Sequence, residues 1–422
     1  MNDLQASYCE DYFKDPENNW NKQILVINFI IASSVESYSF TRGATKINIT
    51  EDTLSKYCEA IIVPELEVEK ATAHPILTSQ CIKFLIIYRN MIPQDWIIDI
   101  LKKLGSFLTH ESVVIRIYSA CAVEKFLSMK NIDTKQLLFT KEAINPLLED
   151  LLKQLNLLLR ESDGLNIYAL ISLFRLVTIA KEDFLPYAKG FSEAIAMFVD
   201  KCTKDSATSA YSIYVLFETI GYVISSSYKM SLEHPQSNCE NIKSYEEALL
   251  PVLNGILTEN RTDIIIYVFQ IYAAFVLYSS SSELAQSYAQ VARSVLEDPS
   301  NTDLDMKYLV PAYVKLLSAI LYRHTGFFAD YKEHLFGLLD KILTTLNLED
   351  DATSLLACMT EVLPIDSISN ELISATKAIF QRMLAYKSKT RMKKIPDSFL
   401  KSVFIFMSRF VLSNSCDHLF NL

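Results

Sequence analysis

The sequence contains few residues that break helices. Eight glycines and twelve prolines are spread over 422 residues, and no Gly/Ser-rich or Pro-rich stretch separates one part of the chain from another. A chain of this length usually splits into two or three compact domains joined by linkers of that kind. Half of the residues are hydrophobic, which together with the scarcity of turn formers suits long helices packed side by side. A single elongated helical array over residues 1–422 reconciles the length with the missing linkers.

Positive charge is also scarce. The formal net charge is −10, the isoelectric point is near 5.3, and the longest basic block is the short RMKK at residues 391–394. Proteins that bind nucleic acid without sequence preference need a basic footprint, so we expect no direct contact with nucleic acid. An acidic chain of this size favours a basic protein surface as its partner.

Cysteine pairs, a signal peptide and a membrane-spanning run are absent too. The eight cysteines are scattered without a CxxC pair, which indicates a reducing compartment. The first 13 residues lack the basic region and apolar core of a signal peptide. The uncharged stretch at residues 264–282 is apolar only as far as residue 278 and contains Gln270, whereas a membrane helix needs about 20 apolar residues. We expect this stretch to be a helix buried between protein layers, without membrane insertion.

Motifs for catalysis or metal binding are missing as well. The six histidines show neither HExxH nor close ligand spacing, and the GxSxG, GxGxxG and P-loop patterns do not occur. The acidic run Glu349-Asp350-Asp351 is interpreted as the solvated start of a helix, where the helix dipole favours negative charge. We therefore expect no enzymatic activity, no metal and no cofactor.

What the sequence does contain is helical periodicity, in segment after segment and without strand-like alternation. The segments come in pairs, and prolines recur in the first helix of a pair, at Pro64, Pro146, Pro186 and Pro251. Paired helices repeating about every 40 residues, with a helix-bending proline in the first, are typical of HEAT repeats. The predicted pairs are 51–67 with 75–91, 94–110 with 112–130, 141–160 with 166–182, 182–202 with 208–228, 244–260 with 264–282, and three more within 283–324, 329–363 and 366–413.

The predicted fold is an all-α HEAT-repeat α-solenoid, a superhelical array of about eight antiparallel helix pairs plus a leading half-repeat. It has no sheet of three or more strands. Two long polar insertions, at residues 38–50 and 229–243, are expected to be irregular. Solenoid ends normally need polar caps. The chain starts in mid-repeat and ends without such a cap, so we expect a segment of a longer protein.

Isolated polar residues on the second helices are the candidate binding residues. Partners of a solenoid usually bind its concave surface, to which we assign the second helices. An alternative interpretation is an inter-repeat hydrogen bond or salt bridge that keeps stacked repeats in register, because a buried lone charge needs a partner. The candidates are Glu124, Arg175, Glu218, Gln270 and Lys315.

Several segments resemble the central and C-terminal HEAT-repeat region of the CAS family of exportins, in the importin-β superfamily. They occur in the order of the family and span nearly the whole chain. The segments are DYFKDPENNWNKQILVINFI (11–30), VPELE (63–67) with HPILTSQCIKFLIIYRNMIP (74–93), VIRIYSACAVEKFLSMK (114–130), YEEALLPVLNGILTENRTDIIIYVFQIY (245–272), AYVKLLSAILYR (312–323) and IFQRMLAYKSKTRMKK (379–394) with FLKSVFIFM (399–407).

The resemblance implies a nuclear export receptor segment that shuttles between nucleus and cytoplasm. Exportins of this family carry importin-α to the cytoplasm together with RanGTP, so GTP would enter only through bound Ran. The N-terminal arch, which supplies much of the Ran binding in the family, has no counterpart here. The match places a second Ran surface at about residues 208–228 and 262–279, with Glu218 as its sharpest candidate. The alternative from another class is a generic HEAT-repeat scaffold that organises a multiprotein assembly.

Overall fold

The computed structural model describes most of the chain as helix. The described residues are 2–131, 134–161, 166–205, 208–233, 240–259, 261–279, 281–297, 308–345, 347–364, 367–388 and 395–413. They divide into two compact units, Met1–Thr219 and Ile220–Leu422, with the boundary inside α11. The single array predicted for residues 1–422 stays a prediction.

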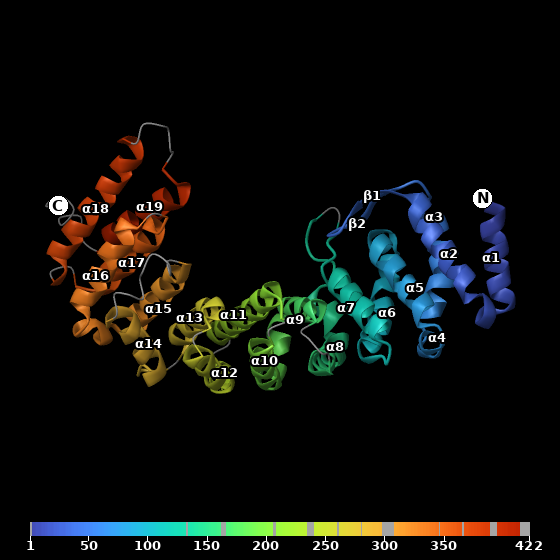
Figure 1. Ribbon diagram of the computed structural model, residues 1–422, viewed down its shortest axis with the longest axis horizontal. Helices are drawn as coiled ribbons and strands as arrows, with labels where there is room; N and C mark the ends of the chain where they lie inside the picture. The colour runs from blue at the N-terminus through green and yellow to red at the C-terminus, as the bar shows by residue number, and fades with distance from the viewer. Residues whose placement is uncertain are drawn as a thin grey trace. The chain divides into compact units, whose positions relative to one another are not determined.

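In the first unit the helices form two layers. The second helices of successive pairs, α2, α5, α7 and α9, pack against one another as one layer, and α6, α8 and α10 form the other (Figure 1). The bounds are α1 (Asn2–Lys14), α2 (Pro16–Ser34), α3 (Glu51–Tyr57), α4 (Val68–Ala73), α5 (Pro75–Tyr88), α6 (Ile97–Ser106), α7 (Val113–Leu127), α8 (Lys141–Glu161), α9 (Ile167–Ala180), α10 (Ala188–Lys204) and α11 (Ala210–Glu233).

In the second unit the same arrangement recurs. The layer of second helices is α13, α15, α17 and α19, and α14, α16 and α18 follow one another in the other layer. The bounds are α12 (Glu240–Thr258), α13 (Thr262–Tyr278), α14 (Gln286–Glu297), α15 (Val310–Arg323), α16 (Lys332–Thr344), α17 (Glu349–Val362), α18 (Ser369–Ser388) and α19 (Asp397–Ser413).

Apolar periodicity explains why these segments are helices and which face each of them buries. In α8 the buried side chains recur three or four residues apart, from Ile144 through Leu151 to Leu159, while Glu149 and Lys153 stay in water. In α13 most apolar side chains are buried, as expected for a helix that packs against others on several sides. In the described part of the chain no helix is long and apolar enough to cross a membrane. The all-α array of helix pairs predicted from the sequence is confirmed.

Two of the four prolines of the first helices lie inside α-helices, and the other two lie in 3₁₀ segments. Pro146 and Pro251 stand inside α8 and α12, within the first two turns of α8 and near the middle of α12. Pro64 and Pro186 lie in the 3₁₀ segments Val63–Leu66 and Lys181–Tyr187 instead. A proline removes one backbone donor, and the tighter 3₁₀ turn accommodates that loss.

The prediction that both polar insertions are irregular is wrong in two places. Residues 35–47 form an antiparallel hairpin of β1 (Val35–Ser39) and β2 (Gly43–Ile47), in which Val35 pairs with Ile47 and Ser39 with Gly43. This two-stranded sheet is the one named sheet of the described residues. In the second insertion α11 continues to Glu233 and α12 begins at Glu240, so only residues 234–239, which lie outside the described residues, remain of the expected break.

The start of the chain also differs from expectation in detail. Residues 2–14, which belong to none of the predicted helix pairs, form α1 and pack against α2. Asp15 caps α2, because its side chain accepts a hydrogen bond from the amide of Asn18 and Pro16 occupies the first turn. Trp20 in α2 stacks on the His74 ring, with 5.6 Å between ring centroids.

Candidate functional site

The hairpin is fixed to the end of α5 by two side chains that follow it. Arg89, which is only 1% exposed, donates hydrogen bonds to the carbonyls of Ile86 and Phe40, and Asn90 donates to the carbonyl of Arg42. A buried guanidinium needs such acceptors, because it carries five N–H donors and no acceptor. Burial lowers the pKa of Arg89, and the Glu124 carboxylate acts against this shift. The anchoring brings the turn of the hairpin over the second-helix layer.

The turn of the hairpin contacts a buried ion pair on α7. Glu124 and Lys125 are 6% and 7% exposed, and Glu124 Oε2 lies 2.8 Å from Lys125 Nζ. Ser128 donates to the other carboxylate oxygen of Glu124 at 3.1 Å. Lys125 Nζ also lies 4.0 Å from the centroid of the Phe40 ring, a cation–π contact that links α7 to the hairpin. Glu124 is thereby engaged within the protein.

Between the hairpin, α7, α9 and α11 lies a groove of about 540 Å³, which we call the hairpin groove. It is lined by Phe40, Thr41, Glu124, Lys125, Ile167, Tyr168, Ile171, Phe174, Arg175, Tyr211, Tyr214, Val215 and Glu218, all of them in the first unit. Its residues from α9 and α11 recur three or four positions apart, as residues on one helix face do. The groove is therefore built by one face of each helix together with the turn of the hairpin.

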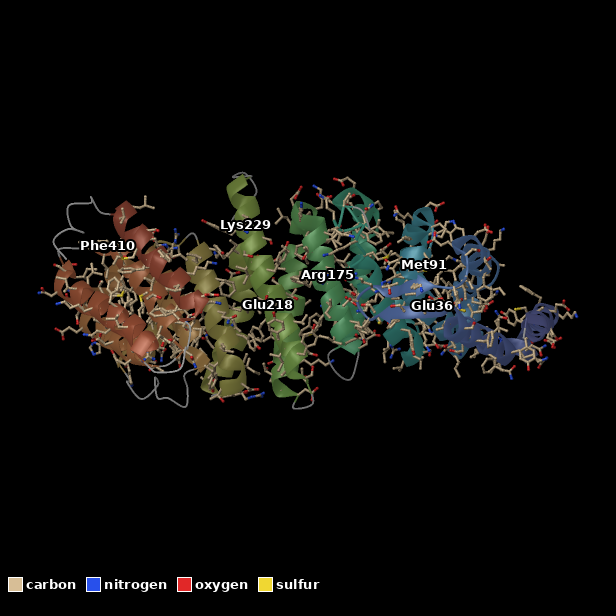
Figure 2. All side chains as sticks on the ribbon, turned by 90° about the horizontal axis from the view of Figure 1, so that it is seen from above. Glu36, Met91, Arg175, Glu218, Lys229 and Phe410 are labelled. Carbon is tan, nitrogen blue, oxygen red and sulfur yellow. The ribbon has the colours of Figure 1, made fainter. Side chains whose placement is uncertain are left out.

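Three of the five candidate residues meet in this groove. They are Glu124, Arg175 and Glu218, and Figure 2 shows Arg175 and Glu218 on the neighbouring helices α9 and α11. Glu218 is exposed, and Arg175 is half-buried with its guanidinium carbon 5.8 Å from the Phe174 ring centroid. The Arg175 Nε atom is buried without a hydrogen-bond acceptor among the described residues.

The other two candidates lie on helices of the second unit. Gln270 is half-buried on α13, and Lys315 is exposed on α15. Lys315 acts on Asp351, in the first turn of α17, and favours the ionised form of its carboxyl group. Neither residue lines the hairpin groove.

The acidic run at the start of α17 is not the solvated helix end that was expected. Glu349 is 2% exposed, and its Oε1 accepts hydrogen bonds from Arg382 Nε at 2.8 Å and from Tyr386 Oη at 2.9 Å. Only its two neighbours, Asp350 and Asp351, keep partial access to water. The interpretation as a solvated run is wrong for Glu349, because α18 folds back against it and supplies the partners.

Asp351 gives the second unit a dependence on pH. Burial, reinforced by the charge of Asp350, raises the pKa of Asp351 to about 6, and Lys315 opposes the shift. Because this pKa lies above that of the unfolded chain, stability falls as the pH rises from about 4 to about 6. Asp351→Asn is therefore expected to raise the free energy of unfolding at pH 7 by about 1 kcal/mol, with no gain at pH 3. Urea unfolding at both pH values measures this difference, and equal stability at pH 7 would contradict it.

Sequence reasoning missed the hairpin and the aromatic lining of the groove. The segment VESYSFTRGATKI holds two short runs rich in β-branched and aromatic residues, separated by a loop that ends in glycine, which is the pattern of a hairpin. On α11, Tyr211, Tyr214 and Glu218 follow the three- and four-residue spacing of a single helix face. Either pattern would have directed attention to this surface.

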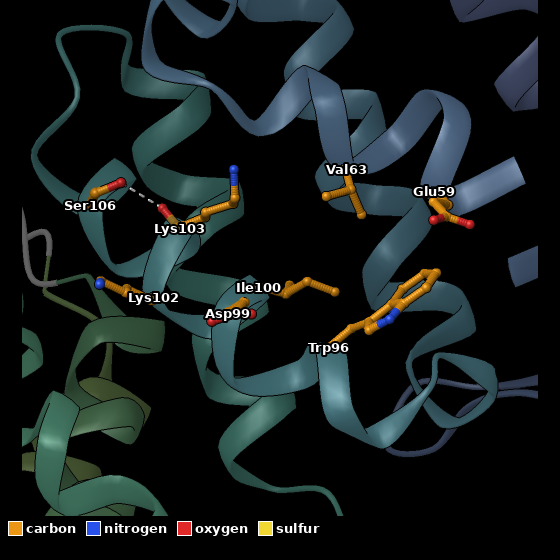
Figure 3. A pocket seen from close by; sticks show the side chains of 8 residues that line it. All are labelled: Glu59, Val63, Trp96, Asp99, Ile100, Lys102, Lys103 and Ser106. Atoms are coloured by element: carbon orange, nitrogen blue, oxygen red, sulfur yellow. Dashed lines mark hydrogen bonds between the residues drawn. The ribbon is translucent and has the colours of Figure 1, made fainter. Parts of the chain in front are cut away.

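A second pocket, of about 590 Å³, lies in the first unit beside α6. Figure 3 shows the side chains of Trp96 and Ile100 directed toward Val63 and Glu59. Lys102 and Lys103, which also line the pocket, follow Ile100 on α6. The pocket is bounded by the π-helical turn Cys58–Ile62 and the 3₁₀ segment Val63–Leu66, and Lys103 is paired with Glu67. It contains none of the five candidate residues, so the hairpin groove remains the candidate site.

Comparison with known proteins covers the whole chain. The family described as CAS/CSE protein, C-terminus matches residues 124–422, and the family described as Cse1 matches residues 2–123. The importin-alpha re-exporter of Schizosaccharomyces pombe is 26% identical over 80% of this chain and 34% of its own length. Mouse exportin-2 is 25% identical over 96% of this chain and 40% of its own length. The chain thus spans well under half the length of these relatives.

A solved structure supports the fold. The structure described as the exportin Cse1 in its cargo-free, cytoplasmic state superposes on 98% of this chain and 41% of its own length, with a TM-score of 0.78 at 19% identity. That likeness shows a HEAT-repeat α-solenoid. The paired helices, the two family matches over residues 2–422 and the similarity to an importin-alpha re-exporter over 80% of the chain lead to one conclusion: the chain belongs to the CAS/CSE family of exportins.

Proposed function

We propose that this chain is part of a nuclear export receptor that binds importin-α together with RanGTP and returns importin-α to the cytoplasm. The observation that carries the proposal is membership of the CAS/CSE family over the whole chain, with relatives named importin-alpha re-exporter and exportin-2. The receptor would move between nucleus and cytoplasm. It would need no cofactor of its own, because GTP would enter only with Ran.

The surface of the first unit is suited to such a role. The hairpin groove combines exposed tyrosines, an apolar floor and charged side chains, which is the composition of many protein–protein interfaces. The acidic balance of the chain favours a basic partner. We propose that importin-α contacts this groove. Glu218, the candidate for the second Ran surface, lines the groove, so we assign it to importin-α and leave to Ran the parts of residues 208–228 and 262–279 that lie outside the groove.

The dependence of importin-α binding on the nucleotide state of Ran tests the proposal. Biolayer interferometry measures the affinity of the chain for importin-α under three conditions. The titration with importin-α is made without Ran, with Ran bound to a nonhydrolysable GTP analogue, and with Ran bound to GDP. The GTP form is expected to raise the affinity for importin-α and the GDP form to leave it unchanged, because coupling between two ligands on one receptor is reciprocal. Binding that ignores the nucleotide would support a generic scaffold. Absence of importin-α binding in both this chain and the full-length protein would overturn the proposal.

A further inference from the structure

The hairpin groove contains two charges of opposite sign that have no hydrogen-bond or ion-pair partner within the described residues; Arg175 contacts the ring of Phe174. Arg175 and Glu218 take part in no ion pair or side-chain hydrogen bond there, and the buried Nε of Arg175 lacks an acceptor. The other two charged residues of the lining, Glu124 and Lys125, are buried and paired with each other. Only Arg175 and Glu218 therefore offer charge to a molecule that enters the groove.

Aromatic and aliphatic side chains lie around the two charges. Tyr211 and Tyr214 on α11 are 59% and 44% exposed and stack on each other at 6.3 Å, while Ile171 and Phe174 on α9 are half-buried. Exposed tyrosines beside a partly apolar floor are the residues that dominate many protein interfaces. Nucleic acid does not fit this groove, because its phosphates need several cations and Arg175 lies in the same groove as the anion Glu218.

We propose that the hairpin groove receives one amphipathic helix of the protein partner, with an acidic side chain paired to Arg175, a basic side chain paired to Glu218 about two helical turns away, and an apolar side chain between them. This inference rests on the proposed function, in which the partner is importin-α. It specifies the segment of the partner that enters the groove and the pattern of charge on it.

The spacing favours a helix over an extended segment. Arg175 and Glu218 stand on two helices whose residues line the same groove. Helices packed side by side lie about 8–10 Å apart in general, and seven residues of a partner helix rise about 10 Å. In an extended segment, residues on the same face recur about every 7 Å, which fits this separation less well. A helix also presents residues i, i+4 and i+7 on one face, so its apolar residue would lie between its two charges.

Neutralising each charge separately tests the pairing. Arg175→Gln and Glu218→Gln are each expected to weaken the binding of importin-α about 10-fold and to reduce its dependence on salt, because each leaves one partner charge unpaired. The exchange Arg175→Glu with Glu218→Arg is expected to weaken binding further. Lys189→Gln and Glu193→Gln on the exposed face of α10, in the other layer, serve as matched controls that leave binding unchanged.

Thermal unfolding of the same variants separates this proposal from an internal ion pair. If Arg175 and Glu218 pair with each other in solution, both single variants should lower the melting temperature and leave the affinity for importin-α intact, and that result would overturn the proposal. Unchanged melting temperatures with weakened binding support it. If the unchanged chain and the full-length protein bind no importin-α, the proposed function fails, and this inference fails with it.

Photo-crosslinking identifies the segment that occupies the groove. Benzoylphenylalanine in place of Tyr214 is expected to capture one importin-α peptide, and the same probe in place of Met197, which is 40% exposed on α10, is expected to capture none. The sequence of the captured peptide, determined by mass spectrometry, must contain an acidic and a basic residue about seven positions apart. A captured peptide without that pattern would overturn the proposed occupant even if importin-α binds the chain.

Discussion

Glu349→Ala is expected to lower the free energy of unfolding of the second unit by about 3–5 kcal/mol. The buried carboxylate of Glu349 is 2% exposed and accepts hydrogen bonds from both Arg382 and Tyr386 on α18. Removing it leaves the Arg382 guanidinium, whose side chain is 20% exposed, without its counter-charge. An uncompensated buried charge costs more than the pair itself contributes, which explains the size of the effect.

Hydrogen exchange measured by mass spectrometry on the full chain locates this loss in α17 and α18. The control is Asp350→Ala, at the neighbouring half-buried carboxylate of the same helix start, and we expect it to change stability by less than about 1 kcal/mol. Replacing both members of the pair, Glu349→Met with Arg382→Met, should restore most of the stability, because two apolar groups of similar volume leave no charge behind. If Glu349→Ala and Asp350→Ala lost protection equally, the buried pair would not be the cause.

Gly43→Ala is expected to detach the hairpin from α5 and to cost about 2 kcal/mol or more in hairpin stability. Gly43 opens β2 with φ of +80°, a conformation that L-residues rarely adopt. A Cβ atom at this position would lie 2.5 Å from the backbone oxygen of Ile87 and 2.8 Å from the Arg89 guanidinium. The backbone oxygen cannot move aside, so the hairpin itself must shift.

Amide exchange in residues 35–47 measures the detachment, with faster exchange expected in the variant. Phe40 should then leave Lys125, and importin-α binding should weaken if the hairpin groove is the binding site. Gly190→Ala provides the matched control, because Gly190 lies in α10 with nothing within 4 Å of its added Cβ. In a helix, replacing glycine by alanine is expected to raise the free energy of unfolding by up to about 1 kcal/mol. Unchanged exchange in Gly43→Ala would show that the close approach does not hold the hairpin.

Helices could be predicted from the sequence because their signal is local. The apolar period of α8 predicted residues 141–160, and the helix spans Lys141–Glu161; the charge-poor run after Arg261 likewise became α13. Each prediction needed only neighbours within a few turns, where the three- and four-residue spacing is visible. The family resemblance added the order of the segments and the expected partners.

Short-range patterns were less informative where contacts between distant segments decide the position or burial of a residue. The hairpin was assigned to an irregular insertion, because its strands alternate weakly and its position depends on Arg89 and Asn90, which lie beyond α3, α4 and α5. Glu349 was assigned to the solvent because an acidic run at a helix start is usually exposed, and only the packing of α18 buries it. The burial of Glu349 could not be found by counting residues along the chain, whereas the hairpin has a local signature in its sequence.

For the binding surface, the sequence by itself determined which residues are unusual and on which helices they stand. Glu124, Arg175 and Glu218 were isolated charges on apolar helices, and that much follows from composition and period. Only the tertiary structure decided their environment: Glu124 is paired with Lys125, whereas Arg175 and Glu218 line the hairpin groove without a hydrogen-bond or ion-pair partner in the described part of the chain. The physical reason is that periodicity fixes which face of a helix a residue occupies, whereas the packing of other segments against that face decides whether its charge is compensated.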